Sequence, residues 1–231
     1  MTRAKYKDLR PKSKGGLPRS LSFTLRIKLP KLYPITDARL SGLSHAEQVR
    51  RLSAGGADLI QLREKHLAPR EFYREAEDAL SIARALGVLL IINDRVDIAL
   101  ALKADGVHLG QDDLPPDAAR ALLGEQAIIG FSTHTVEQAR AAARMPVDYI
   151  AIGPVFETSS KENPDPVVGL DGLRRVRQEV GAIPLVAIGG ISPDSIGKVL
   201  EAGADTVAVI GLLLSNPPLI EARTREILSS L

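Results

Sequence analysis

Eight short apolar segments recur along the chain from Leu32 onward, each separated from the next by a longer helical pattern. They occupy residues 32–36, 58–62, 88–92, 106–109, 127–131, 148–152, 184–188 and 205–210. Short β-branched runs that alternate with helices predict successive β-α-β units and a parallel sheet. Segments such as Val88–Ile92 are continuously apolar, as expected for strands covered on both faces. We therefore predict an α/β fold, a single (β/α)8 TIM barrel over residues 31–231.

Seven of these eight strands run directly into a polar or glycine-rich cluster. The clusters are Gln61–Lys65, Asn93–Asp94, Gly110–Asp113, Ser132–His134, Thr158–Lys161, Gly189–Gly190 and Ile210–Gly211. In a (β/α)8 barrel the loops after the strands form one face and carry the catalytic groups. Segments far apart in the sequence are therefore predicted to meet at a single cleft, which indicates an enzyme.

Composition narrows the classes of protein further. The 231 residues are 45% hydrophobic, enough for one sizeable core, and include no cysteine. Disulfides, thiolate nucleophiles and sulfur-ligated metal centres are thereby excluded, and a cytoplasmic location fits. The longest apolar runs, such as 206–214, are shorter than the ~20 residues that a membrane-spanning helix needs. We expect no membrane partner.

The first 30 residues differ in charge from the rest. Residues 1–31 contain ten Lys or Arg and one acid, which leaves 20 Lys or Arg and 27 acids for residues 32–231. The segment lacks periodicity, so residues 1–30 are predicted to be a basic, disordered extension. Lysines attract phosphates nonspecifically, but Tyr6 and Phe23 are its only aromatic residues. We expect no nucleic-acid partner.

Gln61, Arg63 and Lys65 follow the second strand at a spacing of two. Residues with that spacing point to the same side, so these three are predicted to face the cleft while Leu62 and Glu64 face the helices. Two cations and an amide suit an anionic, phosphorylated ligand. The structural alternative is an ion pair between one of the cations and a neighbouring acid.

Asp94 and Asp113 follow the third and fourth strands. Neighbouring strands lie about 4.8 Å apart, so both carboxylates could serve one cation. Mg²⁺ takes one or two carboxylates and completes its shell with water and phosphate oxygens. Alternatively, Asp94 caps the next helix and Asp113 is a turn residue. Asp112 is expected to face the other way.

Ser132 and His134 follow the fifth strand. Ser132 is interpreted as a hydrogen-bonding group for the substrate, and no acid is expected to orient His134, so a nucleophilic triad is not indicated. Both residues could instead belong to a helix N-terminus, with a hydroxyl as its cap.

The long loop 153–169 and the last two strand ends carry the remaining candidates. A loop of this length is often a lid, although it could also be a solvated loop without function. Its hydroxyls and lysine can bind an anion, and the glycines after strands seven and eight occupy the habitual phosphate site of these barrels. Two anion sites in one cleft imply two phosphorylated substrates. The candidates are Thr158, Ser159, Ser160, Lys161, Gly190, Ile210 and Gly211.

The succession of these motifs resembles the thiamine-phosphate synthase family over about residues 31–215. The motifs that carry the resemblance are Gln61-Leu-Arg-Glu-Lys65, Ile92-Asn-Asp94, Gly106-Val-His-Leu-Gly-Gln-x-Asp113, Ser132-x-His-Thr135, Gly153-Pro, Thr158-x-Ser-Lys161 and Ala187-Ile-Gly-Gly-Ile191. The family joins 4-amino-2-methyl-5-pyrimidinylmethyl diphosphate to 4-methyl-5-(2-phosphoethyl)thiazole, forming thiamine phosphate and diphosphate.

The resemblance implies a role for each candidate. The pyrimidine diphosphate would be held by Gln61, Leu62, Arg63, Glu64, Lys65, Asn93, Ser132 and Lys161, of which Arg63, Lys65, Ser132 and Lys161 would be catalytic. Magnesium would be held by Asp94 and Asp113. The thiazole phosphate would be held by Thr158, Ser159, Ser160, Gly190, Ile210 and Gly211.

Two positions depart from the family, and three functions stay open. Ser160 stands where threonine is common, which preserves the hydroxyl. Gly211 stands where serine is common, which leaves only a backbone N–H for the phosphate. Related thiazole tautomerases share the barrel and some of these motifs, with His134 as the proton-transfer residue, but Asp113 favours the synthase. A noncatalytic ligand-binding barrel is the third alternative. The sequence also leaves open whether identical chains assemble into a homo-oligomer.

Overall fold

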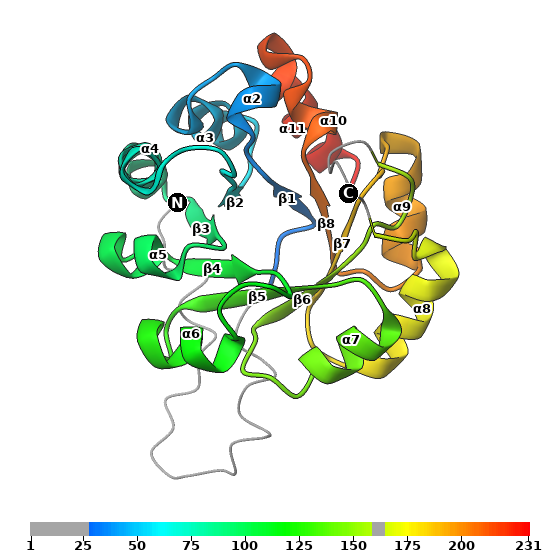
Figure 1. Ribbon diagram of the computed structural model, residues 1–231. Coiled ribbons are helices and arrows are strands. Elements are labelled where there is room, and N and C mark those ends of the chain that lie inside the picture. Colours follow the sequence, from blue (N-terminus) through cyan, green and yellow to red (C-terminus); the bar gives the residue numbers. More distant parts are fainter. Residues whose placement is uncertain (1–27, 159–164) are drawn as a thin grey trace.

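A computed structural model describes residues 28–158 and 165–231. Within these residues eight parallel strands form one sheet, in the order β1-β8-β7-β6-β5-β4-β3-β2. The strands are β1 (Leu32–Pro34), β2 (Leu59–Leu62), β3 (Leu89–Asn93), β4 (Gly106–Leu109), β5 (Ile128–Thr133), β6 (Tyr149–Ile152), β7 (Leu185–Ile188) and β8 (Thr206–Val209). Each lies at a predicted position, which confirms the (β/α)8 barrel (Figure 1).

The ring closes between β1 and β2 through few hydrogen bonds. Ile35 and Gln61 form a single parallel bridge, and the Thr36 N–H donates to the Gln61 carbonyl at 2.8 Å. Gln61 is therefore fixed at the closure of the barrel, directly below the loop that carries Arg63 and Lys65.

Helices surround the ring of strands (Figure 1). They are α2 (Ala38–Ser41), α3 (His45–Ala54), α4 (Pro69–Leu86), α5 (Val96–Leu102), α6 (Pro116–Leu123), α7 (Val136–Ala142), α8 (Gly169–Val180), α9 (Pro193–Glu201), α10 (Gly211–Leu214) and α11 (Ile220–Ser229), with a 3-10 turn η1 (Pro217–Leu219) before α11. Prolines begin α4, α6 and α9, where the absent N–H costs no helical hydrogen bond.

Alternation along the strands separates two apolar layers. In β3, Leu89 and Ile91 point into the barrel, whereas Leu90 and Ile92 pack against the helices. The same alternation applies to β2, where Leu59 faces inward and Ile60 outward. The inner layer fills the barrel on the amino-terminal side of the polar strand ends. The polar residues at the carboxyl ends of the strands therefore pack against apolar side chains below them in the barrel.

The N-terminal extension falls mostly outside the described residues, which begin at residue 28. Leu29, assigned to the extension by the division at residue 30, is buried and packs with the inner apolar layer. The Pro30 carbonyl also accepts a hydrogen bond from Thr206 Oγ1 at 2.8 Å. Across 28–158 and 165–231, none of the helices has both the length and the apolar composition to cross a bilayer.

Candidate active site

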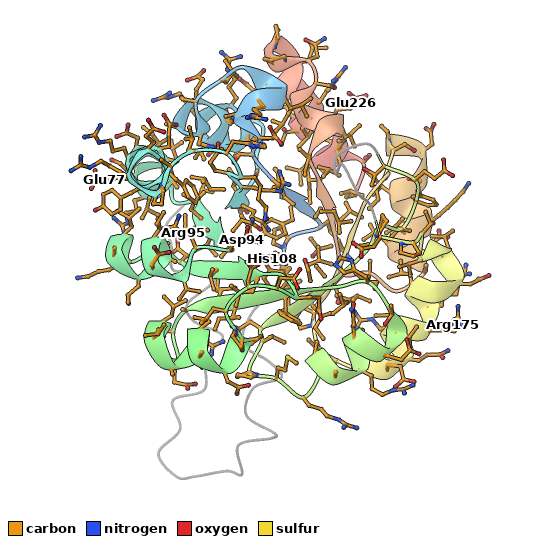
Figure 2. The ribbon with its side chains drawn as sticks, viewed as in Figure 1. Glu77, Asp94, Arg95, His108, Arg175 and Glu226 are labelled. Carbon is orange, nitrogen blue, oxygen red and sulfur yellow. The ribbon has the colours of Figure 1, made fainter. Side chains whose placement is uncertain are left out.

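A cavity of about 670 Å³ opens at the carboxyl ends of the strands. Figure 2 shows Asp94 and His108 on the inner side of the ring, whereas Glu77, Arg175 and Glu226 lie on the helical exterior. The cavity brings together most of the candidates chosen from the sequence. Those that line it are Gln61, Arg63, Lys65, Asn93, Asp94, Asp113, Ser132, Thr158, Gly190, Ile210 and Gly211.

Successive side chains at the end of β2 point to alternate sides, as expected. Gln61, Arg63 and Lys65 line the cavity, whereas the Leu62 side chain is fully buried in the outer apolar layer. Glu64 turns toward the helices, where its Oε2 lies 3.3 Å from His45 Nε2. The side chains of Leu62 and Glu64 therefore do not reach the cavity, although both belong to the set that the resemblance implies for the diphosphate.

Glu64 instead holds the loop in shape. Its Oε1 accepts from the backbone N–H groups of His66 and Leu67, at 2.6 and 3.2 Å. On the other side of the His45 ring, Nδ1 lies 2.8 Å from Thr36 Oγ1, which accepts from the Arg63 N–H at 3.2 Å. This buried network fixes the backbone that presents the two cations to the cavity.

Both cations also have acidic neighbours. Lys65 Nζ binds Asp94 Oδ2, and Arg63 Nη1 lies 3.5 Å from Asp37 Oδ2. The ion pairs that the sequence left open as an alternative are therefore present. They do not remove the cations from the cavity, because 43% of the Lys65 side chain and 21% of that of Arg63 remain exposed.

Asp94 and Asp113 meet at the rim of the cavity. Burial raises the pKa of Asp94, the bonded Lys65 ammonium opposes this, and the neighbouring Asp113 carboxyl, within hydrogen-bonding reach, raises it further. Asp94 has φ 62°, a left-handed backbone that costs about 1–2 kcal/mol in most residues. It does not cap α5, whose N-cap is Arg95.

Asp113 also serves the turn, as the alternative interpretation expected. Its Oδ2 accepts from the Gly110 N–H at 2.7 Å, which fixes the carboxylate beside Asp94. No cluster of three or more metal-ligating side chains exists within the described part of the chain. The Asp94–Asp113 pair still fits Mg²⁺, which needs one or two carboxylates and completes its shell with water and phosphate oxygens.

The expectation for Asp112 was wrong. This residue was expected to face away from the cleft, but it also lines the cavity. Residues 110–113 form a turn rather than a strand, so the alternation of sides does not continue past Leu109.

Asn93, at the end of β3, has an unused donor. The residue is 5% exposed and lines the cavity, and its Nδ2 has no hydrogen-bond partner among the described residues. An unpaired buried amide costs about 1–3 kcal/mol, so such groups usually have a functional reason. Asn93 is therefore suited to donate to a ligand.

After β5, Thr135 has a structural role, whereas Ser132 and His134 remain available for chemistry. Thr135 caps α7, because its hydroxyl accepts from the Gln138 N–H at 3.2 Å, which leaves Ser132 free of that task. The expectation that no acid would orient His134 was wrong: its Nδ1 lies 3.4 Å from Asp165 Oδ2 and 2.7 Å from the Gly153 carbonyl. Asp165 is more than thirty residues away, on a loop whose path the sequence does not specify.

Three glycines and one isoleucine line the opposite side of the cavity, here called the glycine wall: Gly189, Gly190, Ile210 and Gly211. Gly189 and Gly190 have φ of 99° and 65°. A Cβ on Gly190 would lie 2.3 Å from the Glu157 carbonyl oxygen, so only glycine fits. Thr158 lines the cavity beside this wall. Three further residues predicted from the sequence, Ser159, Ser160 and Lys161, lie outside the described residues.

Three residues of the barrel interior were missed. Tyr33, His108 and Tyr149 project inward from β1, β4 and β6 and form a hydrogen-bonded chain below Ser132. The available signal was the residue type, because each is a polar-tipped side chain in an otherwise apolar strand. Their contacts join residues up to 116 positions apart, which strand patterns do not reveal.

The buried imidazole of His108 predicts a pH-dependent stability. Burial lowers its pKa from 6.5 to about 4, so the unfolded chain binds more protons between these values and stability falls as pH decreases. The contribution lost from pH 7 to pH 4 is at most about 3 kcal/mol. Urea unfolding should show a steeper loss of unfolding free energy over this range for the native chain than for His108→Gln. Equal slopes would contradict the assignment.

Fold and site together define the class: a (β/α)8 barrel enzyme with its polar groups at the carboxyl ends of the strands. A family model described as thiamine monophosphate synthase matches residues 32–213. Thiamine-phosphate synthase of Syntrophomonas wolfei is 48% identical over 197 residues, covering 85% of this chain and 93% of the relative. The chain belongs to the thiamine monophosphate synthase family.

Further relatives agree. Thiamine-phosphate synthase of Chloroflexus aurantiacus is 46% identical over 186 residues, covering 80% of this chain and 85% of the relative. Among solved structures, thiamine phosphate pyrophosphorylase from Pyrococcus furiosus superposes with a TM-score of 0.76 at 38% identity, covering 87% of this chain and 96% of that one.

Proposed function

We propose that this enzyme is a thiamine-phosphate synthase. It would join 4-amino-2-methyl-5-pyrimidinylmethyl diphosphate to 4-methyl-5-(2-phosphoethyl)thiazole and release diphosphate. The observation that carries the proposal is a single cavity with two chemically different sides, one cationic and acidic, the other built of glycines. Family membership supports the same reaction. Without cysteine, the chain fits a reducing cytoplasm.

The cationic side suits the diphosphate. Arg63 and Lys65 supply positive charge from a loop fixed by the Thr36–His45–Glu64 network. Asn93 adds an unpaired donor, and Ser132 a hydroxyl. Gln61 faces the same space from the barrel closure. Lys161, from the loop after β6, is proposed as a further cation for the leaving group.

Asp94 and Asp113 are the proposed ligands of Mg²⁺. When bound there, the ion would neutralise negative charge on the diphosphate oxygens. Lys65 would remain near Asp94 and share in that neutralisation, because its ammonium is a flexible point charge on a long stem.

The glycine wall suits the phosphate of the thiazole substrate. Gly190 and Gly211 allow backbone N–H groups to approach phosphate oxygens closely, and Thr158 is positioned beside them. Ser159 and Ser160 are proposed to add hydroxyl donors. Because Gly211 has no side chain, the wall depends more on backbone donors here than where serine stands.

The chemistry needs positioning and charge rather than a protein nucleophile. The bond between the pyrimidine methylene and the diphosphate oxygen breaks, and its electron pair leaves with the diphosphate, which Arg63 and Lys65 stabilise electrostatically. The electron-rich aminopyrimidine stabilises the methylene cation. The thiazole nitrogen, held by its phosphate on the glycine wall, then attacks the methylene carbon and forms the new C–N bond.

One observation favours the second candidate, a thiazole tautomerase. His134 lies at the cavity with Nδ1 engaged by the Gly153 carbonyl and near Asp165, which leaves Nε2 for proton transfer. The Asp94–Asp113 pair has no purpose in a tautomerisation, so we prefer the synthase.

A product assay tests the proposal. Purified enzyme with both substrates and Mg²⁺ should release diphosphate and form thiamine phosphate in equal amounts. Isomerisation of a thiazole carboxylate without ring coupling would instead support the tautomerase. Saturable binding with unchanged ligands would indicate a noncatalytic barrel.

A further inference from the structure

A continuous hydrogen-bonded chain crosses the barrel interior and ends at the active site. Gln61 Nε2 donates to Tyr33 Oη at 3.2 Å, and Tyr33 Oη lies 3.0 Å from Tyr149 Oη. Tyr149 Oη lies 2.9 Å from His108 Nδ1, and His108 Nε2 lies 2.8 Å from Ser132 Oγ. Gln61 and Ser132, the two ends of this network, line the cavity, as do Tyr33 and His108, whereas Tyr149 is fully buried.

The rings of Tyr33, Tyr149 and His108 in this network have little freedom to move. His108 stacks on Tyr149 with centroids 5.5 Å apart, and Tyr149 meets Tyr33 edge to face at 5.9 Å. Gly130 lies between them in register, opposite His108 on one side and Tyr149 on the other. A Cβ on Gly130 would lie 2.0 Å from Tyr149 Cζ, so the absent side chain is what admits the ring.

The donors and acceptors in this hydrogen-bonded network determine which way each of its protons points. The Gln61 NH₂ group can only donate, so Tyr33 accepts there. Because a buried hydroxyl proton without an acceptor is costly, Tyr33 directs its own proton to Tyr149 Oη, 3.0 Å away. Tyr149 then donates to His108 Nδ1. A neutral imidazole that accepts at Nδ1 carries its proton on Nε2. That N–H donates to Ser132 Oγ, and the Ser132 hydroxyl proton remains available to a ligand.

We propose that Tyr33, Tyr149 and His108 are positioning residues that transmit the orientation of the Gln61 amide across the barrel and make the Ser132 hydroxyl a hydrogen-bond donor to the substrate. A donor at this point suits the anionic, acceptor-rich substrate held beside Arg63 and Lys65. The identity of that substrate rests on the proposed function, but the direction of the hydrogen bonds from Gln61 to Ser132 does not.

The reverse direction has a distinct signature. If Gln61 presented its amide oxygen to Tyr33, each proton would point the opposite way, and His108 would carry its proton on Nδ1. Ser132 would then donate to His108 Nε2 and offer only an acceptor to the substrate. The tautomer of one histidine therefore reports the polarity of the whole network.

Nitrogen-15 NMR of histidine-labelled full-length protein at neutral pH measures this tautomer directly. The protein has four histidines, and comparison with the His108→Gln variant identifies the signals of His108. We expect a protonated Nε2 and an unprotonated Nδ1 in the ligand-free enzyme. A protonated Nδ1, or a mixture of both tautomers, would overturn the proposal. Because no substrate is present, this result is independent of whether the proposed reaction is correct.

A double-mutant cycle tests whether the network acts through Ser132. Tyr149→Phe keeps the ring but removes the hydroxyl that donates to His108. We expect kcat to fall about tenfold in the native background and by less than about twofold in a Ser132→Ala background. Ser132→Thr, which retains a hydroxyl, should restore most of the activity lost in Ser132→Ala. Equal losses in both backgrounds would indicate a purely structural role and contradict the proposal.

Tyr73→Phe is the matched control. Tyr73 lies on α4, outside the barrel interior, and its hydroxyl donates to Glu77 Oε1 at 3.3 Å. It should leave both kcat and the His108 tautomer unchanged. Tyr33→Phe provides a second variant within the network and should also mix the tautomers. A single Nε2-protonated tautomer in Tyr33→Phe would show that Gln61 does not set the direction.

Discussion

Asp113→Asn is expected to lower turnover by about 10²–10³-fold, the scale of charge stabilisation that a bound metal ion supplies. The substitution removes the charge but keeps an oxygen that can accept from the Gly110 N–H, so the turn should persist. The KM for the thiazole substrate should change by less than about threefold, because the glycine wall does not include this residue. Steady-state kinetics with each substrate varied in turn measures both effects.

Substitutions of two neighbouring acids serve as controls for Asp113→Asn. Asp117→Asn, an exposed substitution in the first turn of α6, should leave the rate unchanged. Asp112→Asn should have a much smaller effect than Asp113→Asn, although Asp112 also lines the cavity. An undiminished rate in Asp113→Asn would remove this residue from the metal site, and a larger loss in Asp112→Asn would move the assignment to its neighbour.

Gly190→Ala is expected to damage the opposite side of the cavity. The new Cβ would meet the Glu157 carbonyl oxygen at 2.3 Å and the Phe156 Cβ at 2.7 Å, in a backbone with φ 65°. Relief of this clash must displace the wall or the loop that leads to Thr158. We expect the KM for the thiazole substrate to rise about tenfold or more, and the unfolding free energy to fall by about 1–3 kcal/mol.

Gly197→Ala is the control for that substitution. Gly197 lies within α9, and a Cβ there would meet nothing within 4 Å. Alanine should stabilise the helix by about 0.5–1 kcal/mol without affecting either KM. A Gly190→Ala enzyme with unchanged KM for the thiazole substrate would contradict the assignment of the phosphate to the glycine wall.

The strand pattern determined how much of the site could be predicted. Alternation with period two correctly predicted that Gln61, Arg63 and Lys65 line the cavity and that Leu62 and Glu64 turn away, although residues 63–65 follow the last residue of β2. The approach of Asp94 to Asp113 followed from the spacing of adjacent strands. Local geometry was sufficient wherever the residue followed a strand directly.

The prediction failed where the chain leaves regular structure. Asp112 lies in a turn whose backbone direction alternation cannot give. Asp165 reaches His134 from a loop, and Tyr33 meets Tyr149 across the barrel because Gly130 leaves room. These contacts depend on tertiary packing between distant residues, and no property of a single segment indicates them.

In the proposed mechanism, Asp94 and Asp113 from two strand ends hold a divalent ion that helps the diphosphate to leave. The most direct test is diphosphate release by the native enzyme with both substrates, first with Mg²⁺, then with excess chelator, then with Mg²⁺ restored. We expect release to stop with the chelator and to return with the ion. Release at an undiminished rate in the presence of the chelator would show that no divalent ion takes part in the departure of the diphosphate.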